Sequence, residues 1–457
     1  MKDKIINHAN ELVDETVSNI QRLVRINSVR DVEHQEPGKP FGPGIDQAFD
    51  EFLAMSQELG MRTFKDPDGK YAYAELGPED GKLIGILGHL DVVPVGDEAM
   101  WTEAKPFSGD VKDNILYGRG SLDDKGPVVI NMMAIKNLLD LGYEFKSRIR
   151  VIVGGAEETT WECIDKYKKE QEIPVISFSP DSQFPLINAE KTLYQFDAKA
   201  KGSYDFSVEA PGAYNAVCDK ATYTGSKIEE IAANLDKLGY SYEKTNDSII
   251  VSGQSAHSKD CFEGKNAILG LCMALYEAGI HSHAIDYLAT VIKDDCFATN
   301  IMGEKLEEDV SGVLTLNVGR LMIKDGEESI GFDSRIPVLL DDQEIKNKYK
   351  ASVEDSGMEF VQVDNMDKLY VPADSPLVST LLDIYKEVTG DTNAKPLSSG
   401  GATYSRAWDN CVAFGCVFSE QNMIERMHQP NECFEIKFIA PALEIYSLAL
   451  YRLDQLN

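Results

Sequence analysis

The sequence has no apolar run that approaches the ~20 residues a membrane-spanning helix needs, and its first residues lack the apolar core of a signal peptide. Basic side chains are also scarce. The 45 lysines and arginines stand against 76 aspartates and glutamates, which gives a formal net charge of -31. A surface of this sign repels nucleic-acid phosphates and anionic lipids. These features argue against a membrane or a nucleic acid as partner, and solubility accounts for most of the acids.

The eight cysteines contain no CxxC pair. A zinc knuckle needs such a pair, and a disulfide framework is typical of short secreted chains. The scattered thiols therefore indicate a reduced protein, and we expect it to be cytoplasmic. Cys411 and Cys416 flank one apolar segment, where packing is sufficient to explain them.

At 457 residues the chain is too long for one ordinary core, so two domains are expected. Segments 82–93, 148–158 and 174–181 have no polar face, which is typical of strands in a buried parallel sheet. Segment 127–143, between the first two, predicts a crossover helix. The end of the chain resumes this alternation of apolar strands and helices.

The middle of the chain follows another pattern. Segments 192–202, 248–257 and 313–323 alternate apolar and polar residues, as strands of an antiparallel sheet with one solvated face do. Two helical segments, 227–239 and 343–357, each follow a strand pair and precede another strand. This order indicates two related α+β halves.

Together these patterns predict an α/β protein. One domain is expected from residues 1–190 and 373–457, with a mostly parallel sheet and helices on both faces. An α+β domain of two related halves, residues 191–372, is inserted into it.

Acids and histidines stand where the predicted parallel strands end. Because the carboxyl ends of such strands meet at one edge of a sheet, their side chains can converge on a metal ion. Four strand ends and one helix start carry candidates of this kind. They are His89, Asp91, Asp123, Asp124, Glu157, Glu158, Asp181 and His428.

Two histidines among carboxylates form a mixed nitrogen and oxygen ligand set that suits zinc, with manganese or cobalt as alternatives. A carboxylate that bridges two ions ~3.5–4 Å apart gives a site for a water and a carbonyl oxygen. Only one of Glu157 and Glu158 can readily face the metals, so the other is free to act as general base. Asp91 can hold His89 in the correct tautomer.

Ordinary explanations exist for each pattern taken alone. Asp123 and Asp124 could be a charge pair at a helix start, and the paired glutamates could be solvated surface. The other histidines are expected to be surface or core residues without a metal. They are His8, His34, His281 and His283.

Four segments carry a resemblance to a known family. The segments are 88–126, with GHLDVVP and GRGSLDDKG; 154–191, with GGAEETTWECIDKY and FSPDSQFP; 398–418, with SSGGATYSRAWDN; and MHQPNE at 427–432. They resemble the co-catalytic metallopeptidases, a family that contains aminoacylases, desuccinylases and dinuclear-zinc dipeptidases. The WECIDKY and FSPDSQFP stretches are most similar to the bacterial peptidase V-type dipeptidases.

The resemblance implies a role for each candidate ligand. His89 and Asp181 would hold one divalent ion, Glu158 and His428 would hold the other, and Asp123 would bridge them. By the same resemblance Glu157 is the general base, and Asp91 supports the imidazole of His89.

The resemblance also implies substrate contacts from the inserted domain, which would act as a lid. Asn215 in PGAYNAVCDKA and His257 in SGQSAHSKD match residues that reach the substrate carbonyl, and Arg335 in IGFDSRIPV matches the arginine that binds a terminal carboxylate. Gly400 and Gly401 match a turn that lets the backbone approach the substrate. A surface ion pair for Arg335 and a plain loop position for His257 are the alternatives.

The expected function is therefore hydrolysis of unblocked dipeptides by a metal-activated water, with a hinge motion of the lid and a monomeric chain. Two alternatives within the family are an N-acyl-amino-acid deacylase and a carboxypeptidase. A non-catalytic binding protein is a third, although a degenerate copy would be expected to lose the ligand set. A dipeptidase must recognise a free amino group, so Ala-Ala and N-acetyl-alanine would separate these activities.

Overall fold

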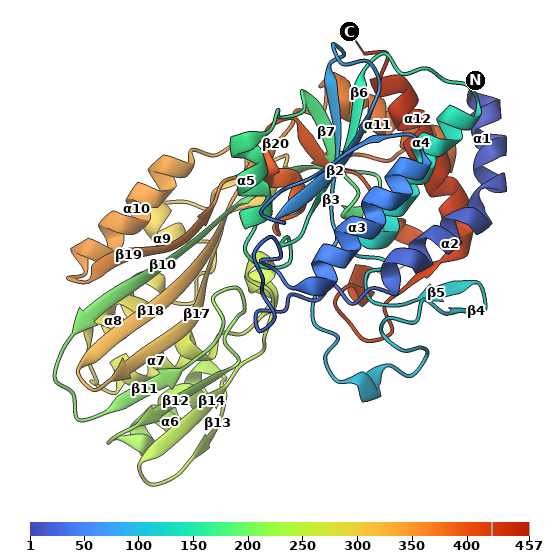
Figure 1. Cartoon of the computed structure of the whole chain (residues 1–457). Helices are drawn as coiled ribbons and strands as arrows, with labels where there is room; N and C mark the ends of the chain where they lie inside the picture. Colours follow the sequence, from blue (N-terminus) through green and yellow to red (C-terminus); the bar gives the residue numbers. More distant parts are fainter. Residues whose placement is uncertain (422–423, 457) are drawn as a thin grey trace. The chain divides into compact units, whose positions relative to one another are not determined.

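The chain divides into two compact units, which the computed structural model describes over residues 1–421 and 424–456 (Figure 1). The first unit comprises Met1–Asn188, Tyr370–Leu397 and Ala402–Asn457. The second unit comprises Ala189–Leu369 and Ser398–Gly401. The second unit is thus an insertion into the first, and the short segment Ser398–Gly401 belongs to this second unit as well.

The apolar runs of the first unit form the parallel centre of its sheet. β3 (Leu83–His89) pairs in parallel with β6 (Arg148–Gly154) and with β7 (Ile176–Ser179), and β7 pairs in parallel with β22 (Cys411–Ala413). Every residue of β3 is buried, as expected for a strand that is covered on both faces. The predicted α/β class with a buried parallel core is confirmed.

Antiparallel strands extend this centre on both sides, so the whole sheet is mixed. β1 (Arg62–Lys65) and β2 (Tyr71–Leu76) form a hairpin beside β6, because their short connection permits only antiparallel pairing. On the other side β22 pairs with β9 (Ile187–Glu190) in antiparallel fashion. The strand order is β1-β2-β6-β3-β7-β22-β9-β20, where β20 is Leu369–Tyr370 and β21 (Leu397–Ser399) also pairs with β9.

Helices cover both faces of this sheet. A Cβ at Gly88 would touch α4 (Lys125–Asp140), whereas a Cβ at Gly154 would touch α5 (Glu162–Glu170). Gly154 pairs with His89, the residue after Gly88, so the two glycines face opposite sides and so do the two helices. The other helices of the unit are α1 (Lys2–Glu11), α2 (Val13–Val24), α3 (Pro43–Glu58), α11 (Pro376–Thr389) and α12 (Ile439–Leu453).

A small three-stranded sheet completes the architecture near the carboxyl ends of these strands. It consists of β4 (Val111–Lys112), β5 (Ile115–Tyr117) and β24 (Cys433–Glu435) in antiparallel pairing. Tyr117 lies opposite Cys433. The loops that adjoin this pair carry Asp123 and His428.

The second unit contains an eight-stranded sheet in the order β13-β14-β12-β11-β17-β18-β10-β19, and all of its pairs are antiparallel. The strands are β10 (Thr192–Lys201), β11 (Ser207–Ala210), β12 (Lys220–Thr224), β13 (Ser241–Lys244), β14 (Ser248–Ser252), β17 (Thr315–Lys324), β18 (Glu327–Ile336) and β19 (Glu359–Met366).

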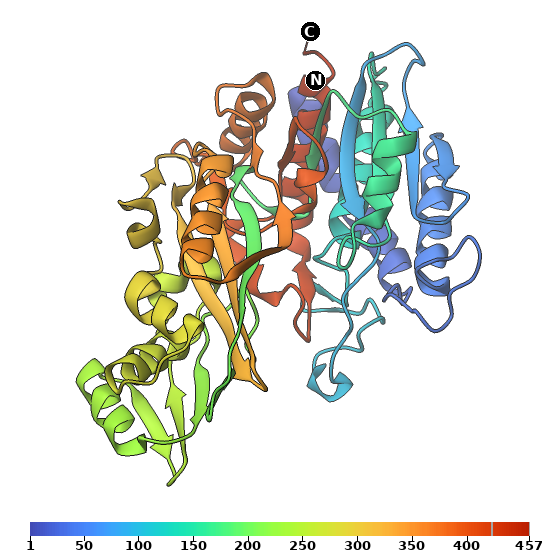
Figure 2. The ribbon, with the colours of Figure 1, turned by 90° about the vertical axis from the view of Figure 1, so that its left-hand side faces the viewer.

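Alternate residues of these strands join one hydrophobic core with the helices. Tyr194, Phe196 and Ala198 of β10 are buried in it, which is the period of two that the sequence shows. The helices therefore cover one face (Figure 2). They are α6 (Ile228–Leu238), α7 (Ala267–Glu277), α8 (His283–Tyr287), α9 (Thr299–Met302) and α10 (Asp342–Asp355).

The two ends of this sheet repeat one topology. On one side β11 and β12 are followed by α6 and then by the edge strand β13; on the other, β17 and β18 are followed by α10 and then by the edge strand β19. A further strand lies inside each edge, β14 in one half and β10 in the other. The pairing of β11 with β17 joins the halves.

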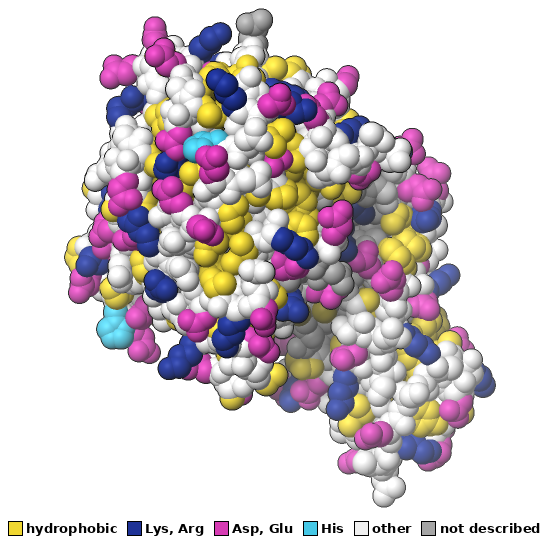
Figure 3. All heavy atoms as spheres, turned by 90° about the vertical axis from the view of Figure 1, so that its right-hand side faces the viewer, with side chains coloured by type: hydrophobic (Ala, Val, Ile, Leu, Met, Phe, Trp, Pro, Cys, Tyr) yellow, Lys and Arg dark blue, Asp and Glu magenta, His cyan; other side chains and the backbone are white. Residues whose placement is uncertain are grey.

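One face of the molecule shows charge that is spread out, as it is along the sequence (Figure 3). On the face shown in Figure 3 acidic side chains are scattered, with basic side chains between them. None of the described helices combines the length and apolar character that crossing a membrane requires.

Candidate metal centre

The candidate ligands of the first unit come from the ends of its central strands. His89 is the last residue of β3, Glu157 and Glu158 follow β6, and Asp181 follows β7. Asp123 precedes α4. Because β3, β6 and β7 are parallel, their carboxyl ends lie at the same edge of the sheet, and the side chains converge there.

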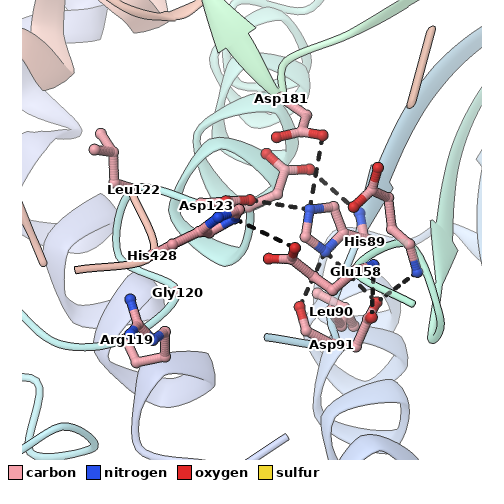
Figure 4. A network of polar contacts seen from close by, with 12 residues as sticks. His89, Leu90, Asp91, Arg119, Gly120, Leu122, Asp123, Glu158, Asp181 and His428 are labelled. Atoms are coloured by element: carbon pink, nitrogen blue, oxygen red, sulfur yellow. Dashed lines mark hydrogen bonds and ion pairs between the residues drawn. The ribbon is translucent and has the colours of Figure 1, made fainter. Parts of the chain in front are cut away.

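Asp123 lies between the two histidines (Figure 4). His89 Nε2 is 3.1 Å from Asp123 Oδ1, and His428 Nε2 is 2.9 Å from Asp123 Oδ2. His89 Nε2 also lies 3.7 Å from Asp181 Oδ2, while His428 Nε2 lies 3.3 Å from Glu158 Oε2. Each imidazole thus faces a different oxygen of Asp123 and a different second carboxylate.

These atoms have the spacing of metal ligands. One atom from each of His89, Asp123 and Glu158 lies within 4.8 Å of the others, and the same holds for His89, Glu157 and Asp181. A mixed set of imidazoles and carboxylates fits zinc, manganese or cobalt. Buried carboxylates that face one another need a positive partner, which a divalent cation supplies.

The pKa shifts in this cluster follow from burial and from the crowding of acids. Burial and the nearby charge of Asp123 raise the pKa of Asp181 to about 7. Burial also acts to raise the pKa of Asp123, but its hydrogen bonds with His428 and His89 hold it below its usual value. Hydrogen bonds with Asp123 and Glu158 raise the pKa of His428 to about 10. The fold therefore favours positive charge at both imidazoles, and a bound cation would take the place of those protons.

Asp91 links the first histidine to the two glutamates. The backbone carbonyl of Asp91 lies 3.0 Å from His89 Nδ1, and its carboxylate oxygen Oδ1 lies 3.5 Å from the same nitrogen. The backbone N–H groups of Glu157 and Glu158 donate to the two carboxylate oxygens at 3.1 and 3.0 Å. An Nδ1 that donates to Asp91 leaves Nε2 free to bind a metal.

Glu157 and Glu158 differ in their partners. Glu158 faces His428, whereas Glu157 groups with His89 and Asp181. Burial raises the pKa of Glu157 well above its usual value, and the charge of Asp181 adds to this shift. A carboxylate with a raised pKa is suited to accept and return a proton near neutral pH.

The candidate substrate residues lie together in the second unit. The backbone N–H of Ser258 donates to the carbonyl of Asn215, and Ser258 Oγ accepts from Arg335 Nε at 3.1 Å. Arg335 is only 3% exposed, which excludes a surface ion pair, and its Nη1 donates to the carbonyl of Gly400 at 2.9 Å. Gly401 donates from its backbone N–H to Ser399 Oγ.

The remaining contacts of these residues define their orientation. Asp333 Oδ1 accepts from Arg335 Nε at 2.7 Å, and Oδ2 accepts from Nη2 at 3.0 Å. His257 Nδ1 accepts from the backbone N–H of Lys259, which leaves its Nε2 as the donor in the neutral ring. Burial and the charges of Arg335 and Lys259 lower the pKa of His257 and favour this neutral form.

Sequence reasoning assigned no role to Arg119 and Glu432, although both form a buried ion pair beside the metal centre. Arg119 Nη1 donates to Glu432 Oε2 at 2.6 Å. Both residues lie in segments that carry the family resemblance, because Arg119 is part of GRGSLDDKG and Glu432 ends MHQPNE. The other histidines have surface environments: His8, His34, His281 and His283 each lie beside a carboxylate.

Comparison with known proteins places the chain in a family. The model of peptidase family M20/M25/M40 matches residues 85–452. YtjP of Bacillus subtilis, provisionally named a dipeptidase, is 32% identical over 465 residues, which cover 96% of this chain and 97% of that protein. SSP1012 of Staphylococcus saprophyticus, named in the same way, is 31% identical over 468 residues, covering 97% of this chain and 98% of its own.

Solved structures share the fold at low identity. Human carnosine dipeptidase 1 is 16% identical with a TM-score of 0.59, covering 99% of each chain. The aminoacylhistidine dipeptidase of Vibrio alginolyticus is 14% identical with a TM-score of 0.59, covering 95% of this chain and 96% of its own. The resemblance found in the sequence is confirmed, and this chain belongs to peptidase family M20/M25/M40.

Proposed function

We propose that this member of the peptidase family hydrolyses unblocked dipeptides with two divalent ions. The observation that carries the proposal is the position of Asp123 between two imidazoles, each of which has its own second carboxylate. This arrangement suits two metal ions, with Asp123 as the ligand that bridges them and one histidine and one carboxylate as further ligands of each ion. The provisional dipeptidase names of relatives that cover nearly the whole chain support the substrate class.

His89 and Asp181 would hold one ion, Glu158 and His428 the other, and Asp123 both. Zinc fits this set well, with manganese and cobalt as alternatives. When bound, such ions supply polarisation of the scissile carbonyl and a water that is acidic near neutral pH.

Glu157 is the proposed general base. Its carboxylate takes a proton from the water and passes it to the amine that leaves. The raised pKa of Glu157 favours the second half of this task, since a proton accepted by the carboxylate is held long enough to be donated. Asp91 accepts from the backbone N–H of Glu157 and so fixes the position from which the Glu157 side chain extends.

The second unit would supply the contacts that recognise substrate. The Nε2–H of His257 is a donor suited to an oxyanion, and Asn215 is assigned to the same task. Arg335 is held by Asp333 through Nε and Nη2, so its orientation is fixed before a substrate carboxylate arrives. Gly400 and Gly401 would let the backbone approach the substrate.

Metal content and substrate choice test this proposal together. We expect two ions per chain after reconstitution, turnover of Ala-Ala, and little turnover of N-acetyl-alanine. Fewer than one ion per chain would overturn the metal-dependent mechanism. Faster turnover of N-acetyl-alanine, or of longer peptides from their carboxyl end, would instead assign the chain to a deacylase or a carboxypeptidase.

We also propose that the chain acts as a monomer in a reducing compartment, the cytoplasm. The pairing of β11 with β17 joins two related halves within one chain, a role that a second subunit could otherwise fill. All eight cysteines are free thiols. Light scattering of the purified protein tests the first point.

A further inference from the structure

Glu432 is a fully buried carboxylate whose partners all belong to the loop that carries Asp123. Its Oε1 accepts three backbone N–H groups, from Gly120 at 2.9 Å, Leu122 at 3.0 Å and Asp123 at 3.2 Å. Its backbone carbonyl accepts from the N–H of Gly118 at 2.9 Å. Glu432 thus accepts from four backbone N–H groups of this loop, and one of them belongs to the proposed bridging ligand.

Arg119 joins the same loop to the segment of His428. Its Nη1 donates to Glu432 Oε2 at 2.6 Å and to the carbonyl of Gln429 at 3.2 Å. Nη2 donates to the carbonyl of Pro94 at 3.3 Å, and the guanidinium lies over the ring of Trp101. The side chain is 1% exposed. Arg119 therefore reaches no solvent and no substrate, and its contacts are all with the protein.

The base of the two loops is fixed by backbone pairing. β5 ends at Tyr117, β24 begins at Cys433, and these two residues lie opposite each other. One loop leads from there to Asp123, and the other leads back to His428, whose side chain is 52% exposed. Since His428 has little packing of its own, its approach to Asp123 depends on how firmly the loops are joined.

The hydrogen bonds require an ionised carboxylate at Glu432. Every partner is a donor, so both oxygens must act as acceptors. A glutamine here would turn an NH2 group toward either the guanidinium or the three backbone N–H groups, although its volume would be almost the same.

We infer that Glu432 and Arg119 form a positioning clamp. The clamp holds the loops of the proposed bridging carboxylate Asp123 and of the proposed ligand His428 at the separation that two metal ions require. The inference rests on the proposed metal-dependent function. Neither residue is among the proposed ligands or substrate contacts. Glu432 acts on the backbone N–H of Asp123, and Arg119 acts through Glu432 and through the carbonyl of Gln429, the residue after His428. The loss of such a supporting contact typically weakens metal binding about 10- to 100-fold.

A matched control lies in the same unit. Glu75 is 7% exposed and accepts from Arg150 Nε at 2.8 Å, with Nη2 of the same guanidinium 2.6 Å away in an ion pair. Glu75 and Arg150 lie opposite each other in the β2–β6 pair, and Glu75 also accepts from Arg62 Nη2 at 2.9 Å. It is a buried ion pair of the same kind whose contacts do not include a candidate ligand. Glu75→Gln should therefore lower the stability of the metal-free protein and leave metal binding within twofold of the parent.

The experiment compares Glu432→Gln, Arg119→Lys and Glu75→Gln with the parent by metal titration, by the visible spectrum of the cobalt(II) form, and by Tm with and without metal. In Glu432→Gln we expect at least one ion to bind about 10- to 100-fold more weakly, the cobalt spectrum to change, and the metal-induced rise in Tm to shrink. Arg119→Lys keeps the positive charge but loses the planar guanidinium and its several donors, so its metal affinity should fall by a smaller factor.

Two results would overturn the clamp. If Glu432→Gln bound both ions within twofold of the parent with an unchanged cobalt spectrum, while its metal-free Tm fell as in Glu75→Gln, the ion pair would be purely structural. If Glu432→Gln did not fold, the same criteria would be applied to Arg119→Lys. A parent protein that bound no metal would instead contradict the proposed function itself, so the two failures are distinguishable.

Discussion

The buried carboxylates at the strand ends of the first unit and two buried carboxylates of the second unit have opposite environments. In the second unit the fold surrounds Asp333 and Glu328 with donors. Asp333 accepts from Arg335 and Gln195, and Glu328 accepts from Tyr204, His283 and the N–H of Ala284. In the first unit the acids at the strand ends face one another and two imidazoles.

The pKa shifts record this difference. Burial alone would raise the pKa of Glu328, but hydrogen bonds from Tyr204 and the N–H of Ala284 outweigh it and lower the pKa. Burial and Asp123 raise the pKa of Asp181 to about 7. A buried acid that the fold has supplied with donors is structural, whereas one left among other acids is available to a cation.

The largest effect is expected at Glu157. Glu157→Gln should lower kcat for Ala-Ala about 10²- to 10⁴-fold, because general base catalysis contributes that much. Metal content should remain that of the parent, since Glu157 is assigned to proton transfer. Steady-state kinetics and metal analysis on the same sample check both points. Turnover above roughly 1% of the parent rate would remove Glu157 from the role of base.

Arg335 should give the next largest effect, and mainly in KM. Arg335→Met removes a charge-assisted pair with the substrate carboxylate, and kcat/KM should fall about 10²- to 10³-fold if each of its two hydrogen bonds is worth about 1.5–2 kcal/mol. The parent should prefer Ala-Ala to its amide, and the variant should not. Asp333→Asn serves as the control, because it keeps the guanidinium of Arg335 but weakens the contacts that orient it. A variant that kept the preference for the free carboxylate would show that Arg335 does not bind it.

The parallel centre of the first sheet could be predicted from the sequence because its strands are buried on both faces. Segments such as 82–93 then show no polar face, and the residues after them must lie at one edge. The antiparallel flanks were not expected, because a hairpin such as β1–β2 has no equally distinctive pattern. The place of Ser398–Gly401 in the second unit rests on a few distant contacts, among them Arg335 with Gly400.

The candidate ligands could be named from the sequence because each is a charged residue at a strand end or a helix start. Glu432 could not be given a role in this way. Three of its partners are backbone N–H groups, which every residue but proline carries and which no sequence pattern marks. The pairing of Arg119 with Glu432 joins positions 313 residues apart, so only the folded chain shows it.

The metal-free first unit should lose stability as pH rises. Because the pKa of Asp181 is raised from 3.8 to about 7, its contribution is fully present below about pH 4 and is lost as pH rises through 7. The loss is at most about 4.5 kcal/mol, since one pKa unit corresponds to about 1.4 kcal/mol. Tm measured in EDTA from pH 4 to 8 should fall less in Asp181→Asn. Identical pH profiles for the two proteins would contradict this account.

The contribution of Glu328 to stability should depend on pH in the opposite direction from that of Asp181. Its pKa lies below the usual value, so its contribution to stability is present above about pH 4.5 and is lost as pH falls. Glu328→Gln should reduce the free energy of unfolding at pH 7 by about 1–3 kcal/mol, because it leaves buried donors poorly paired. Urea denaturation at pH 7 and at pH 4 measures this. The difference between parent and variant should shrink at the lower pH, and a constant difference would contradict the linkage.

The smallest effect is expected where an acid of the second unit has a basic partner but no burial. Glu229 forms an ion pair with Lys244, and its side chain is 82% exposed. Water already solvates both charges, so Glu229→Gln should change the free energy of unfolding by less than about 0.5 kcal/mol. The same denaturation series measures it beside Glu328→Gln. An equal loss in the two variants would mean that burial does not separate structural acids from solvated ones, and the comparison between the units would lose its physical basis.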